Sequence, residues 1–396
     1  MKKKVLIAVL KLLIVAVLFG VIFYAIDWQD SYSRISPEGE TVERIGGQIV
    51  GPWDQDTVRF RADGASTVNT LQRITSSTGE SLLISPGFLT YLKNLDLPLF
   101  ALGAALFFIF VVILNSRWWY LLRANGLGVR FLEAQRFGWI GLFFNNVLPG
   151  STGGDVVKGV YIVRRCSGDK VRAVVSIVVD RIMGVLSLLF VGSLASLLAM
   201  ERFPIFASTV WLIGAGTLVF CFLLISPGLR RLLRFDALVA RLPGRIGNII
   251  AELDRAVLHY RGHLAGIGGW ILASPLIYTL FVGSLFCMDR ALAVGLPLTD
   301  YFFIVPVASI IQGIPIAPAG WGIGEAAYGA LIGKFGAATL PGVPGAEQLM
   351  RTRGVALSVL HRTHVAVWSL LGGLFVLIDR QAHPEDGPLT RGPDAR

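Results

Sequence analysis

Residues 148–155 read LPGSTGGD, and residues 317–325 read APAGWGIGE. Each stretch interrupts an apolar segment with a proline, turns through glycines, and places a carboxylate, Asp155 or Glu325, at the start of a new apolar segment. Helices interrupted at corresponding places in two halves of a membrane protein indicate a transporter-type binding site. The alternative to a binding site is that these stretches are two ordinary loops, each followed by a helix with an acidic N-terminal cap. The repetition favours a binding site, because an arginine within an apolar helix follows each carboxylate.

The composition is that of a membrane protein. The chain has 396 residues, of which 54% are hydrophobic and 16% charged, and its mean hydropathy is +0.65. A soluble domain carries about 25% charged residues. Several windows exceed the roughly 18 apolar residues that cross a bilayer as a helix. We therefore expect an all-α polytopic membrane protein.

The net charge of +10 does not indicate a nucleic-acid partner. The basic residues lie in short loops beside hydrophobic segments, as the positive-inside rule describes. The three cysteines, Cys166, Cys221 and Cys287, have neither a disulfide pattern nor metal-ligand spacing. The sequence also lacks a Walker-type nucleotide motif. It therefore predicts no cofactor and no metal, and any transport would be passive or ion-coupled.

The first 96 residues divide into a membrane helix and a polar insertion. Residues 1–26 combine three lysines with a long apolar run and a poor cleavage site, which predicts an uncleaved first helix with a cytoplasmic N-terminus. Residues 27–96 contain short β-like runs at 57–61 and 81–84. They predict a small β-rich extracytoplasmic insertion that acts as a lid or a partner-contact surface.

Residues 97–226 form the first expected membrane half. Segments 131–148 and 155–163 are both shorter than the roughly 20 residues of a full span. Because basic loops flank them, they predict a re-entrant hairpin that opens from the cytoplasm. Arg117 is expected at a cytoplasmic interface, since tryptophans and further arginines surround it. Full spans are expected at 97–114, 174–200 and 205–225.

A basic linker at residues 227–265 separates the halves and is expected to lie along the membrane surface or only to mark topology. Residues 266–378 form the second half, and residues 379–396 predict a disordered cytoplasmic tail. The second half contains spans at 270–288 and 354–378, hairpin segments at 301–316 and 325–335, and a loop at 337–353. This hairpin is expected to open from the outside. The prediction is about six full spans plus two re-entrant hairpins in an inverted repeat.

The glycine turns predict an internal cavity, because non-helical backbone at membrane depth needs surrounding protein or water. Glycines allow a ligand to approach the backbone, and each following helix offers free N–H groups to an anion. The candidate glycines are Gly153, Gly154, Gly322 and Gly324. Asp155 and Glu325 would either cap these helices or carry protons.

Two arginines within membrane helices, Arg181 and Arg362, are the stronger binding candidates. The planar guanidinium of arginine binds phosphate through paired hydrogen bonds. Asp180 and Arg181 do not face each other on a helix, so both need partners elsewhere. The alternative is structural pairing of Arg181 with Asp155 and of Arg362 with Glu325. Secondary candidates near the turns are Asn145, Asn146, Lys158 and Gln312, and His361 and His364 are either titrating groups or packing partners.

These motifs resemble those of a known family. Asn146, the Leu148-Pro149-Gly150 break, Gly153-Gly154-Asp155 and the later Asp180-Arg181-x-x-Gly184 are similar to the flippase-like membrane domain of lysylphosphatidylglycerol synthases and their relatives. Pro318-x-Gly320-x-Gly322-x-Gly324-Glu325 is similar to the second loop of that domain, with Ala319 where a glycine is expected. The resemblance implies a membrane protein that moves or binds a polar lipid. The soluble acyltransferase domain of the full synthases is not expected here, so aminoacyl transfer is not implied.

The leading hypothesis is a lipid flippase or lipid-binding transporter of the cytoplasmic membrane, and whether the chain is an enzyme stays open. Its ligand would be an anionic phospholipid or a polyprenyl-phosphate lipid, held by Arg181 and Arg362. One alternative is an intramembrane glycosyl- or phospho-transferase that uses Asp155, Asp180 and Glu325 as general acid, general base or metal ligands. The other is a non-catalytic membrane scaffold that uses the insertion at 27–96 as its contact surface.

Overall fold

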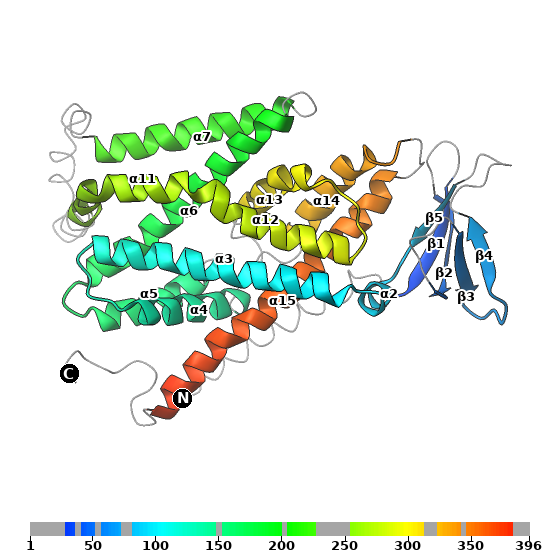
Figure 1. Ribbon diagram of the computed structural model, residues 1–396, viewed down its shortest axis with the longest axis horizontal. Coiled ribbons are helices and arrows are strands. Elements are labelled where there is room, and N and C mark those ends of the chain that lie inside the picture. Colours follow the sequence, from blue (N-terminus) through cyan, green and yellow to red (C-terminus); the bar gives the residue numbers. More distant parts are fainter. Residues whose placement is uncertain are drawn as a thin grey trace, which may run out of the picture. The chain divides into compact units, whose positions relative to one another are not determined.

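The computed structural model describes residues 28–35, 41–51, 57–72, 81–147, 153–199, 204–226, 254–312, 323–341 and 346–382. Most of them are helical, and one small antiparallel sheet is present (Figure 1). The chain packs into two compact units. Unit 1 comprises the described residues of Met1–Leu106 and Val282–Val365, and unit 2 those of Phe107–Phe281 and Ala366–Arg396.

The helices of the membrane part follow the apolar segments of the sequence. They are α2 (Phe88–Lys93), α3 (Leu97–Ala124), α4 (Phe131–Val147), α5 (Gly153–Arg165), α6 (Lys170–Ala199), α7 (Pro204–Ile225), the 3-10 helix η1 (Tyr260–His263), α11 (Leu264–Leu272), α12 (Ser274–Ala291), α13 (Leu298–Gln312), α14 (Ile323–Ala337) and α15 (Ala346–Ala382). Among the described residues, four stretches are long and apolar enough to cross a membrane: Leu97–Ala124, Lys170–Leu197, Asp254–Ala291 and Met350–Ile378.

These four stretches cover four of the six expected spans. The span expected at 205–225 coincides with α7, whose apolar stretch Ser208–Val219 is shorter. The span expected at 1–26 lies outside the described residues. Large apolar side chains on the helices are open to the surroundings; Leu212 of α7 is 75% exposed. In a bilayer such side chains meet hydrocarbon that is as apolar as leucine itself.

Two expected boundaries near the C-terminus are wrong. The loop predicted at 337–353 ends early, because α15 already begins at Ala346. Charged residues there suggested a loop, but the helix turns Glu347 and Arg351 outward and buries Met350. The same helix continues through Ala382, so residues 379–382 of the predicted disordered tail are helical, and the rest of that tail lies outside the described residues.

The insertion contains a five-stranded antiparallel sheet in the order β4-β3-β2-β1-β5 (Figure 1). The strands are β1 (Asp30–Ile35), β2 (Thr41–Ile49), β3 (Thr57–Ala62), β4 (Asn69–Gln72) and β5 (Ser81–Ser85). Exposed and buried residues alternate along β3, so Val58 and Phe60 point to one face, where the Tyr32 ring packs edge-on at 5.0 Å from that of Phe60. The expected β-rich character is confirmed; its extracytoplasmic position stays a prediction.

Replacing Asp30 by alanine is expected to loosen this sheet. The buried carboxylate of Asp30 accepts hydrogen bonds from the backbone N–H groups of Ile49 and Gly87, each at 2.7 Å. Without an acceptor, each buried amide costs about 1–3 kcal/mol. Amide hydrogen exchange of β1 and β2 should therefore accelerate in Asp30→Ala. The exposed Asp63 offers a control, and equal exchange in Asp30→Ala and Asp63→Ala would contradict this role.

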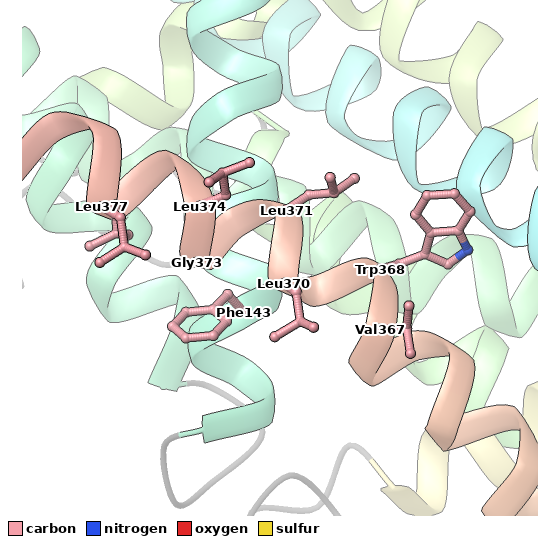
Figure 2. Close-up of a pocket in the computed structure, with 9 residues that line it drawn as sticks. Phe143, Val367, Trp368, Leu370, Leu371, Gly373, Leu374 and Leu377 are labelled. Carbon is pink, nitrogen blue, oxygen red and sulfur yellow. The ribbon is translucent and has the colours of Figure 1, made fainter.

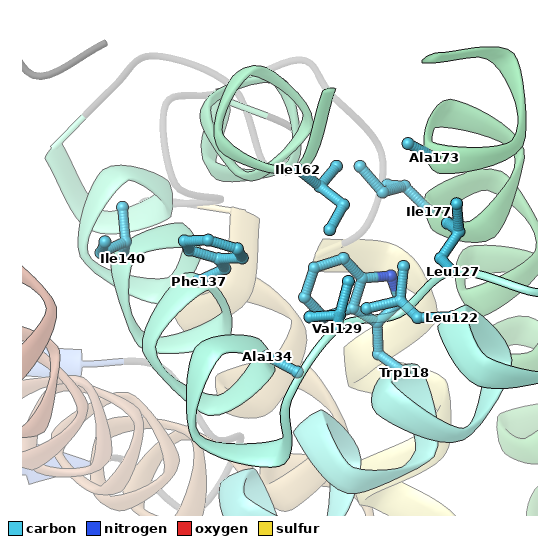
Figure 3. Packing of buried hydrophobic residues seen from close by; sticks show 10 residues of the cluster. All are labelled: Trp118, Leu122, Leu127, Val129, Ala134, Phe137, Ile140, Ile162, Ala173 and Ile177. Carbon is cyan, nitrogen blue, oxygen red and sulfur yellow. The ribbon is translucent and has the colours of Figure 1, made fainter. Parts of the chain in front are cut away.

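A buried apolar cluster in unit 2 fixes α4 and α5 against α3 and α6 (Figure 3). It comprises Trp118, Leu122, Leu127, Val129, Ala134, Phe137, Ile140, Ile162, Ala173 and Ile177. The indole N–H of Trp118, at the centre of this cluster, donates a hydrogen bond to the hydroxyl of Ser176 at 3.2 Å. A tryptophan buried with its N–H satisfied has a fixed orientation. This packing therefore determines where the charged groups next to Trp118 lie.

Candidate binding sites at two helix breaks

In unit 2, the end of α4 and the start of α5 meet at a glycine. The backbone N–H of Gly154 donates a hydrogen bond to the side-chain oxygen of Asn145 at 2.8 Å. A Cβ atom on Gly154 would overlap the carbonyl oxygen of Gly141, so only glycine allows this approach of the two helices. The turn itself, residues 148–152, lies outside the described residues. Gly153 opens α5 next to this contact.

The carboxylate of Asp155 lies in the first turn of α5 and contacts the guanidinium of Arg181 on α6. The structural pairing that was the alternative to headgroup binding by Arg181 is thus present in the fold. The Arg181 side chain is 52% exposed and that of Asp155 is 20% exposed. The guanidinium side of this ion pair is therefore accessible from outside the helices, whereas the carboxylate side is mostly buried.

Asp180 points away from Arg181, as expected for neighbours on a helix, and has two cationic partners. Its carboxylate lies 3.0 Å from Nε of Arg117 and 3.8 Å from Nζ of Lys158. The Lys158 ammonium also lies 3.6 Å from the centroid of the Trp118 ring, within cation–π distance. Lys158, a secondary candidate from the sequence, therefore belongs to this charged cluster.

Arg117, which the sequence places at a cytoplasmic interface, has a buried side chain, and its position relative to the membrane stays a prediction. Its side chain is 7% exposed, and it donates hydrogen bonds to both the carboxylate and the backbone carbonyl of Asp180. Arginines next to tryptophans suggested an interface, yet α3 continues through Ala124 and turns Arg117 towards α6. A missing partner for Asp180 was the one sequence signal that pointed to a buried cation.

In unit 1, the end of α13 and the start of α14 form a comparable break. A Cβ atom on Gly324 would overlap the guanidinium of Arg362 and the side-chain amide of Gln312. Nε of Arg362 lies 2.5 Å from the carboxylate of Glu325, and both side chains are nearly buried, at 12% and 13% exposure. The second predicted pairing is thus also present. Gly322 and the rest of 313–322 lie outside the described residues.

The two breaks contain the same sequence of groups. An amide side chain lies in the last turn of the first helix, and a glycine is the second residue of the next helix. A carboxylate directly follows this glycine and pairs with an arginine on the succeeding long helix. The groups are Asn145, Gly154, Asp155 and Arg181 in unit 2, and Gln312, Gly324, Glu325 and Arg362 in unit 1. We call these sets the unit 2 site and the unit 1 site.

Other candidates lie outside these sets. The amide of Asn146 donates to the carbonyl of Leu142 within its own helix at 3.1 Å, and its neighbour Asn145 makes the contact across the break. The rings of His361 and His364 lie 4.7 Å apart, and His364 packs edge-on against Phe100. These contacts are those of packing partners.

Unit 2 also carries an apolar groove of about 670 Å³ next to the helix break (Figure 2). Phe143 of α4 and residues of α15 between Val367 and Leu377 line it. Its lining is almost entirely hydrocarbon, which suits an acyl chain. Phe143 stands two residues before Asn145, so the groove and the unit 2 site share the last turns of α4.

Apolar helices of spanning length, interrupted by charged helix breaks, define a polytopic α-helical membrane protein. A profile of the lysylphosphatidylglycerol synthase transmembrane region matches residues 85–346, and the chain belongs to this family. The matched region contains the whole unit 2 site but ends before Arg362 of the unit 1 site. Strands β1–β4 precede it.

A relative from Pyrococcus horikoshii, the UPF0104 membrane protein PH1989, is 31% identical over 107 residues. The match covers 26% of this chain and 32% of the relative. The chain therefore matches about a third of the length of that protein.

Proposed function

We propose that this protein binds a phosphate-bearing lipid headgroup at its helix breaks and moves the lipid across the cytoplasmic membrane. The observation that carries this proposal is the repeated set of amide, glycine, carboxylate and arginine, with one set in each unit. Transporters built from inverted repeats bind their substrates at such interrupted helices. In this proposal α4–α5 and α13–α14 are re-entrant hairpins that open from opposite faces.

Phosphate is the headgroup chemistry that fits these sites. Each set brings a guanidinium to the first turn of a helix, where backbone N–H groups and the helix dipole favour an anion. Arginine binds phosphate oxygens through paired, charge-assisted hydrogen bonds. The half-exposed side chain of Arg181 in unit 2 is accessible to a headgroup while it contacts Asp155.

Lipid, rather than a soluble phosphate compound, is supported by the apolar groove. It begins at Phe143, within one turn of Asn145, so an amphiphile could place its headgroup at the unit 2 site and an acyl chain in the groove. The family name refers to lysylphosphatidylglycerol, a phospholipid, which agrees with a lipid ligand.

The test is lipid movement in vesicles that contain the purified protein. The Arg181→Lys/Arg362→Lys variant keeps both charges but loses the planar fork, so movement of a labelled anionic phospholipid is expected to slow by roughly tenfold or more. Accessibility of the label to a membrane-impermeant quencher measures the rate.

Arg172→Lys/Arg351→Lys is the matched control, because these two exposed arginines lie on the same two helices, α6 and α15. It should move lipid like the unmodified protein. The proposal fails if vesicles with unmodified protein move lipid no faster than empty vesicles, or if both double variants behave alike.

A further inference from the structure

Helices α4 and α5 also meet at the end opposite their break. The rings of Phe137 (Figure 3) and Tyr161 lie 5.6 Å apart, and Nε of Arg165 donates a hydrogen bond to the carboxylate of Glu133 at 2.9 Å. These two contacts are about one turn apart on each helix. Phe137 precedes Asn145 by eight residues, so this end of the helix pair lies about 12 Å from the break along α4.

Two arginines, one on each helix, lie between these contacts. Arg136 directly precedes Phe137 on α4, and Arg164 stands three residues after Tyr161, on the same side of α5. The charges of both guanidinium groups act on the hydroxyl of Tyr161. The side chains of Arg136, Tyr161 and Arg164 therefore converge between the helices, and we call them the arginine–tyrosine cluster.

One donor of this cluster is buried and lacks an acceptor. Nη1 of Arg164 is withdrawn from the surface and makes no hydrogen bond within the part of the chain that the structure describes. A buried N–H group without an acceptor is costly, and in a folded protein such a group commonly marks a place for a water molecule or an ion. The cluster thus presents a fixed donor to an acceptor from outside the chain.

Two carboxylates at this end of the helices already have cationic partners. Glu133 accepts hydrogen bonds from Nε of Arg165 and from the backbone N–H of Arg130, both at 2.9 Å. Asp169, in the turn after α5, lies 3.5 Å from Nη1 of Arg172. An external anion therefore suits the cluster better than either of these side chains.

We propose that the arginine–tyrosine cluster binds the phosphate group of a membrane lipid, as a site separate from both helix breaks. Two guanidinium groups and a hydroxyl can all donate, and phosphate oxygens accept the paired, charge-assisted hydrogen bonds of arginine. This inference goes beyond the proposed function and shares with it only the lipid as the source of the phosphate. The cluster gives a lipid headgroup a second place on the same pair of helices, about 12 Å from the unit 2 site.

Apolar side chains beside the cluster favour a lipid over a soluble phosphate compound. Leu132, one turn before Arg136 on α4, is 77% exposed, and Val160, the neighbour of Tyr161 on α5, is 37% exposed. In a bilayer such side chains meet hydrocarbon. A lipid bound at the cluster can therefore lay its acyl chains along them.

The aromatic residues nearby are those of a membrane interface. Trp119 and Tyr161 pack against the same buried apolar cluster, and the guanidinium of Arg123 lies 5.5 Å from the centroid of the Trp119 ring. Tryptophan, tyrosine and arginine together are typical of the level of lipid headgroups. These neighbours fit a site that takes a phosphate from the bilayer surface.

The test is binding of a short-chain lipid in a non-ionic detergent, measured by calorimetric titration. It uses the whole chain with Arg181→Lys/Arg362→Lys, so that the helix breaks contribute less to the signal. In this background, Arg136→Gln/Arg164→Gln is expected to bind dihexanoyl phosphatidylglycerol at least about tenfold more weakly.

Arg130→Gln/Arg172→Gln is the matched control, because it removes two exposed arginines from the same end of the helices. It should bind like the background protein. Tyr161→Phe removes only a hydroxyl and keeps the packed ring, so it tests the site even where the arginine variant does not fold; binding should weaken about threefold or more. Equal affinities in the cluster variants and the control would overturn the proposal.

A titration with inorganic phosphate separates the two sources of the anion. If Arg136→Gln/Arg164→Gln weakens binding of phosphatidylglycerol, the cluster holds a lipid phosphate. If it weakens binding of inorganic phosphate alone, the ligand is a soluble compound and the proposal of a lipid site is overturned.

The vesicle assay separates this inference from the proposed function. Weaker lipid binding in the cluster variants of a protein that moves no lipid supports the cluster and rejects the proposed function. Lipid movement together with equal binding in the cluster variants and the control rejects the cluster alone.

Discussion

Arg362→Ala is expected to destabilise unit 1 by about 3–5 kcal/mol, because it leaves the nearly buried carboxylate of Glu325 without its cation. Removing both charges should cost much less, since the double variant Arg362→Ala/Glu325→Ala leaves neither charge of the pair behind. The loss of stability in the single variant is therefore mainly the cost of an unpaired charge. Thermal or denaturant unfolding of the detergent-solubilised protein measures both values.

The ion pair of Arg181 with Asp155 in unit 2 provides an internal comparison for this loss of stability. Arg181 is half exposed, so solvent screens the loss of its partner, and Arg181→Ala should cost less than about 1 kcal/mol. Arg351→Ala removes an exposed arginine from α15 and controls for the loss of a long side chain. A double variant that is as unstable as Arg362→Ala alone would show that the ion pair is not the cause.

Gly154→Ala is expected to be the most damaging single-methyl substitution at either helix break. The added Cβ would overlap the carbonyl oxygen of Gly141, a backbone atom that cannot move unless α4 and α5 separate. Overpacking of this kind costs roughly 1–3 kcal/mol or more. In Gly324→Ala the overlap involves the side-chain ends of Arg362 and Gln312, which can rotate away, so the loss of stability should be smaller.

Gly159 offers a matched control on the same helix. A Cβ atom there would meet only the end of the Ile177 side chain at 3.5 Å, an ordinary contact. Gly159→Ala should therefore stabilise α5 by about 0.5–1 kcal/mol through helix propensity. Unfolding midpoints of the three variants should rank Gly159→Ala above Gly324→Ala above Gly154→Ala. A Gly154→Ala variant as stable as the unmodified protein would contradict the close approach of the helices.

The helix breaks and their charged partners were largely accessible from the sequence. Proline and glycine end a helix through local sterics, so α4, α5, α13 and α14 begin or end close to the predicted residues. The geometry of a helix also separates Asp180 from Arg181 without knowledge of the fold. The structural pairings of Arg181 with Asp155 and of Arg362 with Glu325, the alternative to headgroup binding in the sequence, follow from the rule that buried charges need partners.

The remaining contacts depend on how helices rotate against one another, which local patterns do not specify. Arg117 has the sequence surroundings of an interface arginine, and only the packing of α3 on α6 places it next to Asp180. Asn145 and Asn146 are equivalent in the sequence, but one step along a helix turns a side chain by about 100°, so only one faces α5.

The hydrogen bond between Asp30 and Gly87 has a practical consequence for imaging. It joins the first strand of the sheet to a residue two positions after the last strand, so the two ends of the insertion lie side by side. A segment with adjacent ends can be exchanged for another folded domain of similar spacing without stretching the flanking chain. A 42.9 kDa membrane protein offers little mass outside a detergent micelle for particle alignment in electron microscopy. The insertion marks the place where a rigid fiducial domain can be grafted.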